Sequence, residues 1–350
     1  MASTPIKACV LGASGYTGAE MLRLLAVHDG ISVVACTANA LAGRRLTDVF
    51  PHLSSYGDMI LTTVEDVDWA SVDLAISCLP HGTSQDLIEE LPSHVRVVDL
   101  SADYRFRSAE IYSETYKRSH LAPERTANAV YGLTEFARDR LPDADLVACP
   151  GCYPTATLMC LLPASEAGLI RQQDIIIDAK SGVSGAGRGL KEGNLFCETA
   201  EGLHPYGIGV HRHAPEIEQE IGQRFGGECF VTFTPHLVPM TRGELVTVYA
   251  ALGEGVSVDD IQNCLEARYE NEPFVNVRPA GSLPPDTRHV RGTNRCEISV
   301  HKDRNPNRVI IIGAIDNLTK GSAGQALQNI NLMFGFEETK ALDILQPLFP

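Results

Sequence analysis

Cys152 lies where a reactive thiol would be expected. The string Ala148-Cys149-Pro150-Gly151-Cys152-Tyr153-Pro154-Thr155 follows an apolar run and leads into a segment with leucines at helical spacing. Pro154 suits the first turn of a helix, because the N–H that proline lacks has no helical partner there. Cys152 is therefore expected beside a helix N-terminus, where the dipole favours the thiolate and free N–H groups can stabilise an oxyanion. We predict that Cys152 is a nucleophile.

Two other interpretations of Cys152 remain open. It can be a buried packing residue, as we expect for most of the ten cysteines, such as Cys9, Cys36, Cys78 and Cys229. Cys149-x-x-Cys152 also matches a dithiol redox motif. Cys149, however, falls inside the apolar strand expected over 146–149, so its side chain is not expected to reach Cys152. A dithiol protein would require Cys149 for activity, whereas a nucleophile mechanism requires only Cys152.

The densest group of candidate bases is His211-Arg212-His213, directly before a helical segment. A thiolate needs a partner that moves protons, and either histidine can supply it. As a metal site the group is incomplete, because no Cys or His cluster of matching spacing offers the remaining ligands. We therefore expect no metal.

A glycine-rich segment near the N-terminus indicates a nucleotide site. Gly12-Ala13-Ser14-Gly15-Tyr16-Thr17-Gly18 lies between an apolar strand over 7–11 and a helix over 19–28. Such glycines allow a tight turn and a close backbone approach, and the helix N-terminus presents free N–H groups to a pyrophosphate. The motif alone is weak and also fits a plain turn, but its position between strand and helix favours a dinucleotide.

The end of the second strand, expected over 31–36, favours NADP(H) over NAD. An NAD enzyme usually carries an acid there for the ribose 2′-hydroxyl. This chain has Thr37 instead, and Arg44 and Arg45 follow shortly. A small polar residue with nearby arginines suits a 2′-phosphate. The alternative is that both arginines simply face solvent.

The elements that carry these motifs predict two domains. Residues 1–151 alternate apolar strands, such as 73–78 and 95–100, with helical patterns, which indicates a Rossmann-type, doubly wound parallel sheet. After residue 151 the helices become fewer, and an α+β catalytic domain over 152–317 with a large mixed, mostly antiparallel sheet is expected. The last helix, over 321–334, is expected to return to the first domain, which would comprise 1–151 and 318–350. Strands of the second domain are expected over 174–179, 229–235, 245–252, 296–300 and 308–315.

Composition excludes several classes of protein. The 350 residues carry a formal charge of −15, which argues against nucleic acid, since phosphate backbones are bound mainly by clustered Lys and Arg. No apolar run approaches the roughly 18–20 residues of a membrane helix, and residues 1–7 do not resemble a signal peptide. We expect a cytoplasmic protein without a membrane partner. An anionic substrate would need local arginines to overcome the overall field.

Taken in order along almost the whole chain, the motifs resemble the N-acetyl-gamma-glutamyl-phosphate reductase family, which is related to the aspartate-semialdehyde dehydrogenases. The most specific strings are Pro150-Gly-Cys-Tyr-Pro-Thr155 and His211-Arg-His-Ala-Pro-Glu-Ile217. Gly12–Gly18 is similar to the family's NADP loop. Three further segments also resemble family motifs, namely Leu100-Ser-Ala-Asp-Tyr-Arg105, the loop from Ser181 to Arg188, and Asp316-Asn-Leu-Thr-Lys-Gly321.

The resemblance implies a glyceraldehyde-3-phosphate dehydrogenase-like fold and an NADPH-dependent reduction of an acyl phosphate through a thioester on Cys152, in arginine biosynthesis. His213 would be the first choice of base, because it aligns best with the related dehydrogenases' histidine, with His211 close behind. Arg105 would hold the inorganic phosphate, and Arg188 or Arg212 the substrate carboxylate. Additional cofactor contacts would come from Ser181, Gly182, Asn317 and Lys320. A homodimer or homotetramer is expected, with the large sheet as a plausible contact surface.

Two other functions remain open at this stage. A related semialdehyde dehydrogenase would use the same chemistry on an acyl phosphate of different length, or on one bound to a carrier. A regulator that senses a dinucleotide would keep the fold without the chemistry, although the presence of Cys152 and both histidines speaks against it.

Overall fold

The computed structural model describes residues 4–347, which divide into two compact units. One unit comprises residues 4–150 and 322–344, and the other comprises residues 151–321 and 345–347. The boundaries expected from the sequence differ by a few residues. Gly151 belongs to the second unit because its backbone is bound by Glu216, and residues 318–321 join it because Gly321 packs against Cys152.

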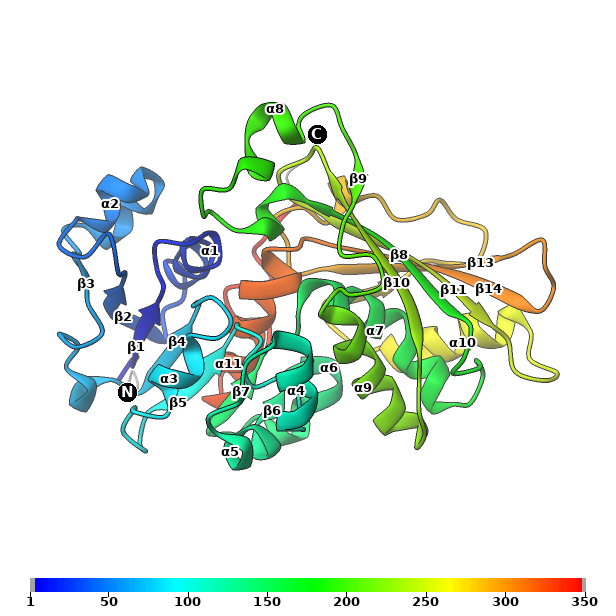
Figure 1. Cartoon of the computed structure of the whole chain (residues 1–350), viewed down its shortest axis with the longest axis horizontal. Helices are drawn as coiled ribbons and strands as arrows, with labels where there is room; N and C mark the ends of the chain where they lie inside the picture. The colour runs from blue at the N-terminus through cyan, green and yellow to red at the C-terminus, as the bar shows by residue number, and fades with distance from the viewer. Residues whose placement is uncertain (1–3, 348–350) are drawn as a thin grey trace. The chain divides into compact units, whose positions relative to one another are not determined.

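The N-terminal unit contains a seven-stranded sheet in the order β3-β2-β1-β4-β5-β7-β6 (Figure 1). Every pair of neighbouring strands is parallel. The chain order reverses between β1 and β4, which is the place where ligands bind in sheets of this kind. The strands are β1 (Ile6–Leu11), β2 (Ile31–Thr37), β3 (Leu61–Thr62), β4 (Leu74–Ser77), β5 (Arg96–Asp99), β6 (Val130–Tyr131) and β7 (Leu146–Ala148).

Helices complete this unit. Its C-terminal helix, α11, contacts α1, α6 and β5. Buried polar side chains of α11 form hydrogen bonds to the rest of the unit. Asn331 Oδ1 lies 3.0 Å from Nε2 of His28, and Asn329 donates to the carbonyl oxygen of Gly132 at 2.8 Å. The helices are α1 (Tyr16–Leu25), α2 (Leu46–Val49), α3 (Ser84–Ile88), α4 (Ala109–Tyr116), α5 (Pro123–Asn128), α6 (Thr134–Ala137) and α11 (Gly324–Met333).

The second unit also has a seven-stranded sheet, in the order β12-β13-β14-β11-β8-β10-β9. β8 and β10 are parallel, as are β12 and β13, whereas the other four neighbouring pairs are antiparallel. The predicted mixed, mostly antiparallel sheet is therefore confirmed. The strands are β8 (Ile175–Gly182), β9 (His204–Pro205), β10 (Val231–Val238), β11 (Glu244–Ala251), β12 (Val275–Val277), β13 (Cys296–Lys302) and β14 (Arg308–Ile315).

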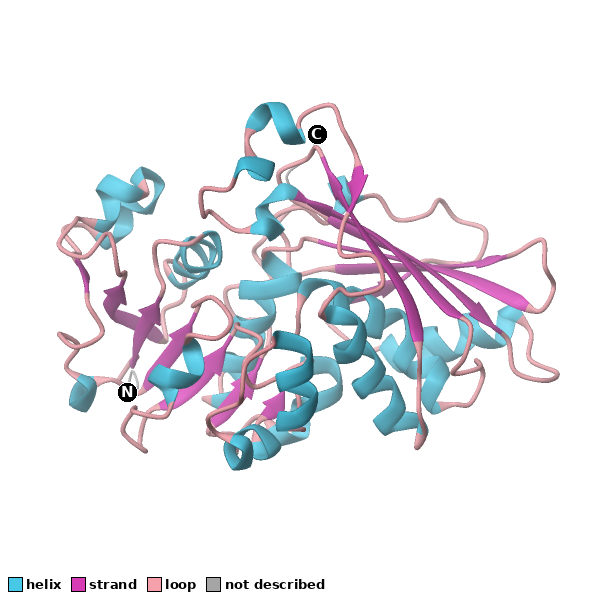
Figure 2. Cartoon of the chain, viewed as in Figure 1, coloured by secondary structure: helices cyan, strands magenta, loops and turns pink. Residues whose placement is uncertain are grey.

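Helices α7 (Cys152–Glu166), α9 (His213–Phe225) and α10 (Val258–Tyr269) lie along one face of this sheet (Figure 2), and α8 (Phe196–Thr199) belongs to the long connection after β8. Contact between α7 and the sheet is close at Gly313. A Cβ atom there would lie 2.6 Å from Cys160 Sγ and 3.2 Å from Val246 Cγ2. Glycine thus allows the central helix to lie directly on β11 and β14, and α7 is buried along residues 153–165.

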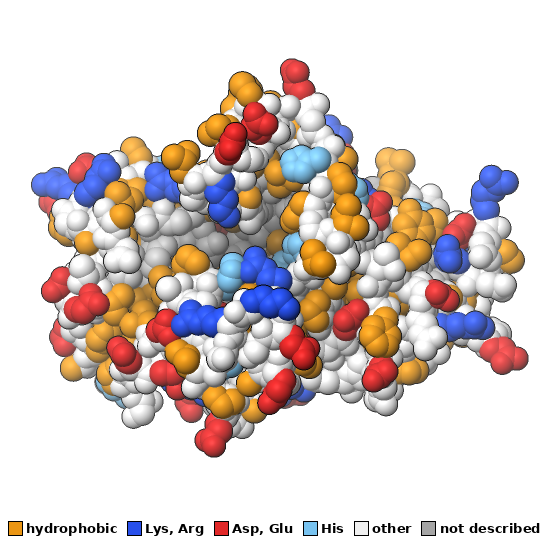
Figure 3. Space-filling view, in the orientation of Figure 1, with side chains coloured by type: hydrophobic (Ala, Val, Ile, Leu, Met, Phe, Trp, Pro, Cys, Tyr) orange, Lys and Arg blue, Asp and Glu red, His pale blue; other side chains and the backbone are white. Residues whose placement is uncertain are grey.

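Surface and helix properties agree with the composition. Acidic side chains are spread over the face drawn in Figure 3, in keeping with the net charge of −15. Within residues 4–347, no helix combines the length and apolarity that crossing a bilayer requires.

Candidate active site

Cys152 is the first residue of α7, and Gly151 is the cap residue before it. Gly151 has extended backbone angles (φ −63°, ψ 159°), and the helix has neither a side-chain cap nor an acidic residue in its first turn. Cys152 is partly exposed, whereas residues 153–165 of the helix are buried. The positive end of the α7 dipole therefore acts on the sulfur, which favours the thiolate.

The residue before the nucleophile is fixed by two hydrogen bonds. Glu216 Oε1 accepts the backbone N–H of Gly151 at 2.9 Å, and the hydroxyl of Thr155 donates to the Gly151 carbonyl oxygen at 2.9 Å. Glu216 lies on α9 and is fully buried. Helix α9 thus sets the start of α7, and with it the position of the thiol.

The two predicted histidines both lie against Tyr153, the residue that follows Cys152. The ring of Tyr153 lies 5.9 Å from the ring of His211 and 5.8 Å from that of His213, between centroids. The histidine rings are 4.8 Å apart, and the Tyr153 hydroxyl lies 3.2 Å from that of Tyr206. The structure therefore brings both candidate bases together on the element next to the nucleophile.

The two histidines differ in what they can do at neutral pH. Burial lowers the pKa of His211 to about 4, with the charge of Arg212 as a further cause. Nδ1 of His211 accepts the backbone N–H of His213 at 3.2 Å, which places the proton of the neutral ring on Nε2. His211 is therefore a neutral side chain that holds the first turn of α9, and His213 is the better candidate for a group that gains and loses a proton.

Asn317 connects the loop after β8 to the start of β11. Its Nδ2 donates to the hydroxyl of Ser184 at 2.9 Å, and its Oδ1 accepts the backbone N–H of Gly243 at 2.9 Å. Asn317 is a predicted nicotinamide contact, and in the structure both atoms of its side-chain amide are used to hold this loop in place. Ser181 and Gly182 are buried at the end of β8, and Lys320 is fully buried with its ammonium 5.9 Å from the Phe274 ring centre.

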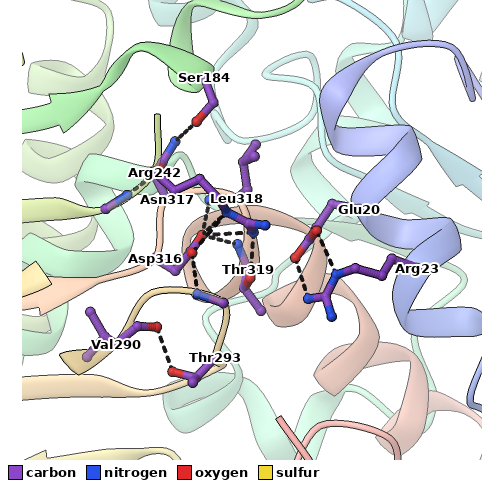
Figure 4. Close-up of polar contacts among 12 residues, drawn as sticks. Glu20, Arg23, Ser184, Arg242, Val290, Thr293, Asp316, Asn317, Leu318 and Thr319 are labelled. Carbon is purple, nitrogen blue, oxygen red and sulfur yellow. Dashed lines mark hydrogen bonds and ion pairs between the residues drawn. The ribbon is translucent and has the colours of Figure 1, made fainter. Parts of the chain in front are cut away.

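Asp316, which the sequence analysis placed in a family motif without a role of its own, is the centre of a buried network (Figure 4). Its carboxylate forms an ion pair with Arg242 at 3.0 Å. It also accepts backbone N–H groups from Gly292 at 2.6 Å, Leu318 at 2.8 Å and Thr319 at 3.0 Å. This fully buried carboxylate joins the end of β14 to two loops, and so fixes the segment that leads to Lys320.

Replacing this carboxylate should destabilise the second unit. We expect Asp316→Asn to lower the free energy of unfolding by about 3 kcal/mol or more, because it leaves the Arg242 charge without its partner in a buried site. Urea unfolding followed by circular dichroism measures the change. Asp58→Asn is the matched control, because its ion pair with Arg45 is exposed and such pairs contribute about 1 kcal/mol or less. Equal effects of the two substitutions would contradict the prediction.

In the N-terminal unit, the glycine loop has the geometry of a phosphate cradle. Gly12 has φ +71°, and the N–H of Gly15 donates to its carbonyl oxygen at 3.1 Å. A Cβ atom at Gly18 would lie 2.7 Å from Ala13 Cα and from the Gly12 carbonyl oxygen. Helix α1 begins at Tyr16 without a side-chain cap or an acidic first turn. These residues fit a dinucleotide pyrophosphate. Ser14, Tyr16 and Thr17 lie at this turn and are partly or fully exposed.

The residues predicted to select NADP have different roles in the structure. Thr37 is buried, and its hydroxyl accepts the Gly12 N–H at 3.4 Å, so it supports the loop. Arg45 pairs with Asp58 at 2.7 Å. Arg44 is exposed and makes no ion pair with any residue in the 4–347 range. Arg44 therefore stays the predicted contact for a 2′-phosphate.

Arg105 lies at the carboxyl ends of β5 and β7, where it is buried. Its Nε donates to the Cys149 carbonyl oxygen at 2.7 Å and its Nη2 to that of Leu100 at 3.0 Å. The thiol of Cys149 is buried as well, and Nδ2 of Asn329 donates to its sulfur at 3.7 Å. Burial raises the pKa of Cys149 to about 12, so this thiol is neutral and unreactive at pH 7.

The remaining predicted residues, Arg188 and Arg212, are both exposed in the second unit. Among the described residues, no group of three or more His, Cys, Asp or Glu side chains is arranged to hold a metal ion. None of the ten cysteines, which all lie within residues 4–347, forms a disulfide bond.

Comparison with known proteins places this geometry in a family. The model of the semialdehyde dehydrogenase NAD-binding domain matches residues 7–144, and that of the semialdehyde dehydrogenase dimerisation domain matches residues 152–317. N-acetyl-gamma-glutamyl-phosphate reductase of Rhodospirillum rubrum is 50% identical over 353 residues, covering 99% of this chain and 100% of that protein. A probable chloroplastic enzyme of the same name from Arabidopsis thaliana is 50% identical over 345 residues, covering 99% of this chain and 86% of that protein.

The chain belongs to the N-acetyl-gamma-glutamyl-phosphate reductase family.

Solved structures show the same fold at low sequence identity. Aspartate semialdehyde dehydrogenase II of Vibrio cholerae has a TM-score of 0.71 and 17% identity, covering 95% of this chain and 99% of that one. The enzyme of Candida albicans, solved with NADP, has a TM-score of 0.66 and 15% identity, with 95% and 99% coverage. The predicted family and fold class are thus confirmed, whereas the roles of individual site residues in this reductase-family chain stay predictions.

Sequence reasoning missed one further residue beside the nucleophile. Glu244 is fully buried at the start of β11, where the expected strand began one residue later. The signal was present, because Glu244 shares its alternation phase with Val246, Val248 and Ala250, which form the buried face of the strand.

Proposed function

We propose that this chain reduces N-acetyl-gamma-glutamyl phosphate to N-acetylglutamate 5-semialdehyde and inorganic phosphate, using NADPH and a thioester on Cys152, as a step of arginine biosynthesis. The observation that supports this function best is the first turn of α7. A partly exposed thiol stands there at the positive end of a helix, with its preceding residue held by Glu216. The names of relatives at about 50% identity over nearly the whole chain support the choice of substrate.

The first half of the reaction is an acyl transfer. The Cys152 thiolate attacks the acyl carbon, the S–C bond forms, and the C–O bond to phosphate breaks. We propose that backbone N–H groups in the first turn of α7 stabilise the oxyanion that forms in between. Arg105 is proposed to hold the departing phosphate, and Arg188 or Arg212 the substrate carboxylate, because guanidinium groups bind both kinds of anion in bidentate fashion.

The second half reduces the thioester. NADPH, when bound at the Gly12–Gly18 loop with its 2′-phosphate near Arg44, supplies the hydride. His213 donates a proton to the alkoxide that hydride addition to the thioester leaves, which gives the thiohemiacetal. It takes the proton back as the C–S bond breaks, which releases the aldehyde and restores the thiolate. Ser181, Gly182, Asn317 and Lys320 are proposed to support the nicotinamide end of the site. His211, being neutral, keeps the first turn of α9 in place.

The proposal extends to the assembly and the location of the protein. A family model described as a dimerisation domain matches residues 152–317, which supports assembly as a homodimer or homotetramer. The protein is proposed to act in the cytoplasm. The alternative substrate is an acyl phosphate of different length or one bound to a carrier, since the same residues would perform the same chemistry on it.

The reverse reaction tests the function directly. Purified protein given N-acetylglutamate 5-semialdehyde should reduce NADP only when phosphate is present, and NADP should be preferred to NAD. A longer semialdehyde run in parallel separates the two substrates. Reduction of NADP without phosphate would contradict the acyl-phosphate mechanism. Turnover of any of these aldehydes would exclude a regulator that only senses the dinucleotide.

A further inference from the structure

Glu244 is a buried acid for which the mechanism above has no role. It is the first residue of β11, where it pairs with Ser181 of β8 and with Ile315 of β14. Its side chain has no exposed surface. A carboxyl in this position, between two strands and under a helix, requires an explanation, because unpaired charges are expensive to bury.

The carboxyl of Glu244 lies under the start of α7. Glu244 shares its strand face with Val246, and Val246 faces α7, because both Val246 Cγ2 and Cys160 Sγ approach Gly313. At the end of the strand, a Cβ atom at Gly321 would meet Cys152 Cβ at 2.7 Å and Ile315 Cδ1 at 3.2 Å. Since Ile315 is the register partner of Glu244, the carboxyl adjoins the nucleophile, and it interacts with the Cys152 thiol and the Ser181 hydroxyl.

Within residues 4–347, no cation compensates a charge on this carboxyl. Glu244 forms no ion pair with any residue of the described chain, and neither of its oxygens accepts a hydrogen bond of ordinary geometry there. A buried carboxylate without a cation or aligned donors is far less stable than the neutral acid. The structure of the site therefore favours the protonated form.

The other titratable groups around Glu244 do not change this conclusion. Tyr153 and Tyr206 are neighbours whose pKa burial raises, so both stay neutral. Asp316 is negative, and its charge is matched by Arg242. Burial raises the pKa of Glu244 from 4.5 to about 8; the Cys152 thiol opposes this rise and Asp316 adds to it. At neutral pH most molecules thus carry the acid.

We propose that Glu244 is a neutral carboxylic acid whose O–H donates a hydrogen bond to the Cys152 sulfur and so stabilises the thiolate from the sheet side. The α7 dipole acts on the same sulfur from the helix side. A neutral donor also adds no negative charge where an anionic acyl phosphate must approach. This role rests on the proposed nucleophile function of Cys152, and it makes Glu244 a positioning residue that acts through the thiol.

The titration of the Cys152 thiol tests this role without substrate. We would measure the rate of iodoacetamide labelling of Cys152 against pH by mass spectrometry in wild type, Glu244→Gln and Glu244→Leu. Glu244→Leu, which has no donor, should move the midpoint up by about one pH unit and slow labelling at pH 7 roughly tenfold, because the thiolate loses a hydrogen bond that favours it. Glu244→Gln keeps an amide N–H that can donate to the sulfur, so its midpoint should rise less.

The direction of the shift decides the outcome. A carboxylate would repel the thiolate, so a midpoint that falls in both variants would show that Glu244 is charged and overturn the proposal. An unchanged midpoint in Glu244→Leu would overturn it too, because the two groups would then not interact. Cys197, which is exposed, is the internal control and should label alike in every variant. Labelling needs no turnover, so failure of the proposed enzyme activity would be seen separately.

A measurement on the wild type covers the case in which neither variant folds. Infrared difference spectra before and after labelling of Cys152 report on carboxyl groups near the sulfur. At pH 7 the C=O stretching band of a protonated carboxyl should shift when the sulfur is alkylated. Absence of any protonated-carboxyl band in the difference spectrum would overturn the proposal.

Discussion

Cys152→Ser should lose roughly 10⁴-fold or more of kcat, the scale seen when the nucleophile of a catalytic unit is removed. A serine hydroxyl at the same helix start remains protonated at neutral pH, because the dipole that suffices for a thiol cannot ionise an alcohol. The expected result is a folded protein that still binds NADP but shows no phosphate-dependent reduction of NADP. Initial rates and NADP fluorescence quenching measure the two properties independently.

Cys149→Ser is the matched control for this experiment. The Cys149 thiol is buried, has a raised pKa and accepts a hydrogen bond from Asn329, so we expect it to take no part in the chemistry. We expect its kcat to stay within a few fold of the wild type. A loss in Cys149→Ser as large as that in Cys152→Ser, with the fold intact, would favour a dithiol mechanism over the thioester.

His213→Asn should lower kcat by about 10²–10⁴-fold, which is the usual contribution of a general acid or base. Asparagine keeps hydrogen-bonding capacity but cannot gain and lose a proton. Because the pKa of His211 lies near 4, His211 is neutral at pH 7 and cannot replace its neighbour as an acid. The pH dependence of kcat should lose one ionisation in this variant.

His211→Asn is the comparison that distinguishes the two histidines. We expect a smaller loss of kcat than in His213→Asn, because His211 holds the backbone of α9 through Nδ1 and asparagine can accept a similar bond. If His211→Asn shows the larger loss and removes the ionisation, the assignment of His213 as the base is wrong and the two roles are exchanged.

Much of the site could be predicted because its signals are local. The turn around Gly12–Gly18 is set by residues that are adjacent in sequence, and so is the helix start at Cys152. Even there, the exact start of a helix was not predicted. Helix α1 begins at Tyr16, inside the glycine motif, so that its first-turn N–H groups belong to the loop itself. The sequence predicted a helix start at residue 19, because the apolar residues at helical spacing begin there. The actual first turn starts at Tyr16 and does not follow that apolar spacing.

What could not be predicted depends on contacts between distant segments. Strand β10 continues through Pro235 to Val238, because it follows β8 in parallel register as far as Gly182. Strands β3 and β6 have two residues each, too few to show a period. The protonation of Glu244 arises from burial under α7, a helix that is about 90 residues away in the sequence, and no local pattern records it.

The spacing between His213 and Glu216 has a consequence for how this chain can vary. The two residues are one helical turn apart on α9, one beside Tyr153 and the other on the N–H of Gly151. Inserting a single residue between them would rotate the second by about 100° around the helix axis and remove it from Gly151. His213, the proposed base, and Glu216, which holds Gly151, therefore need a fixed spacing on α9. Variants can exchange side chains within this turn, but a change of its length would separate His213, the proposed base, from the residue that positions Cys152.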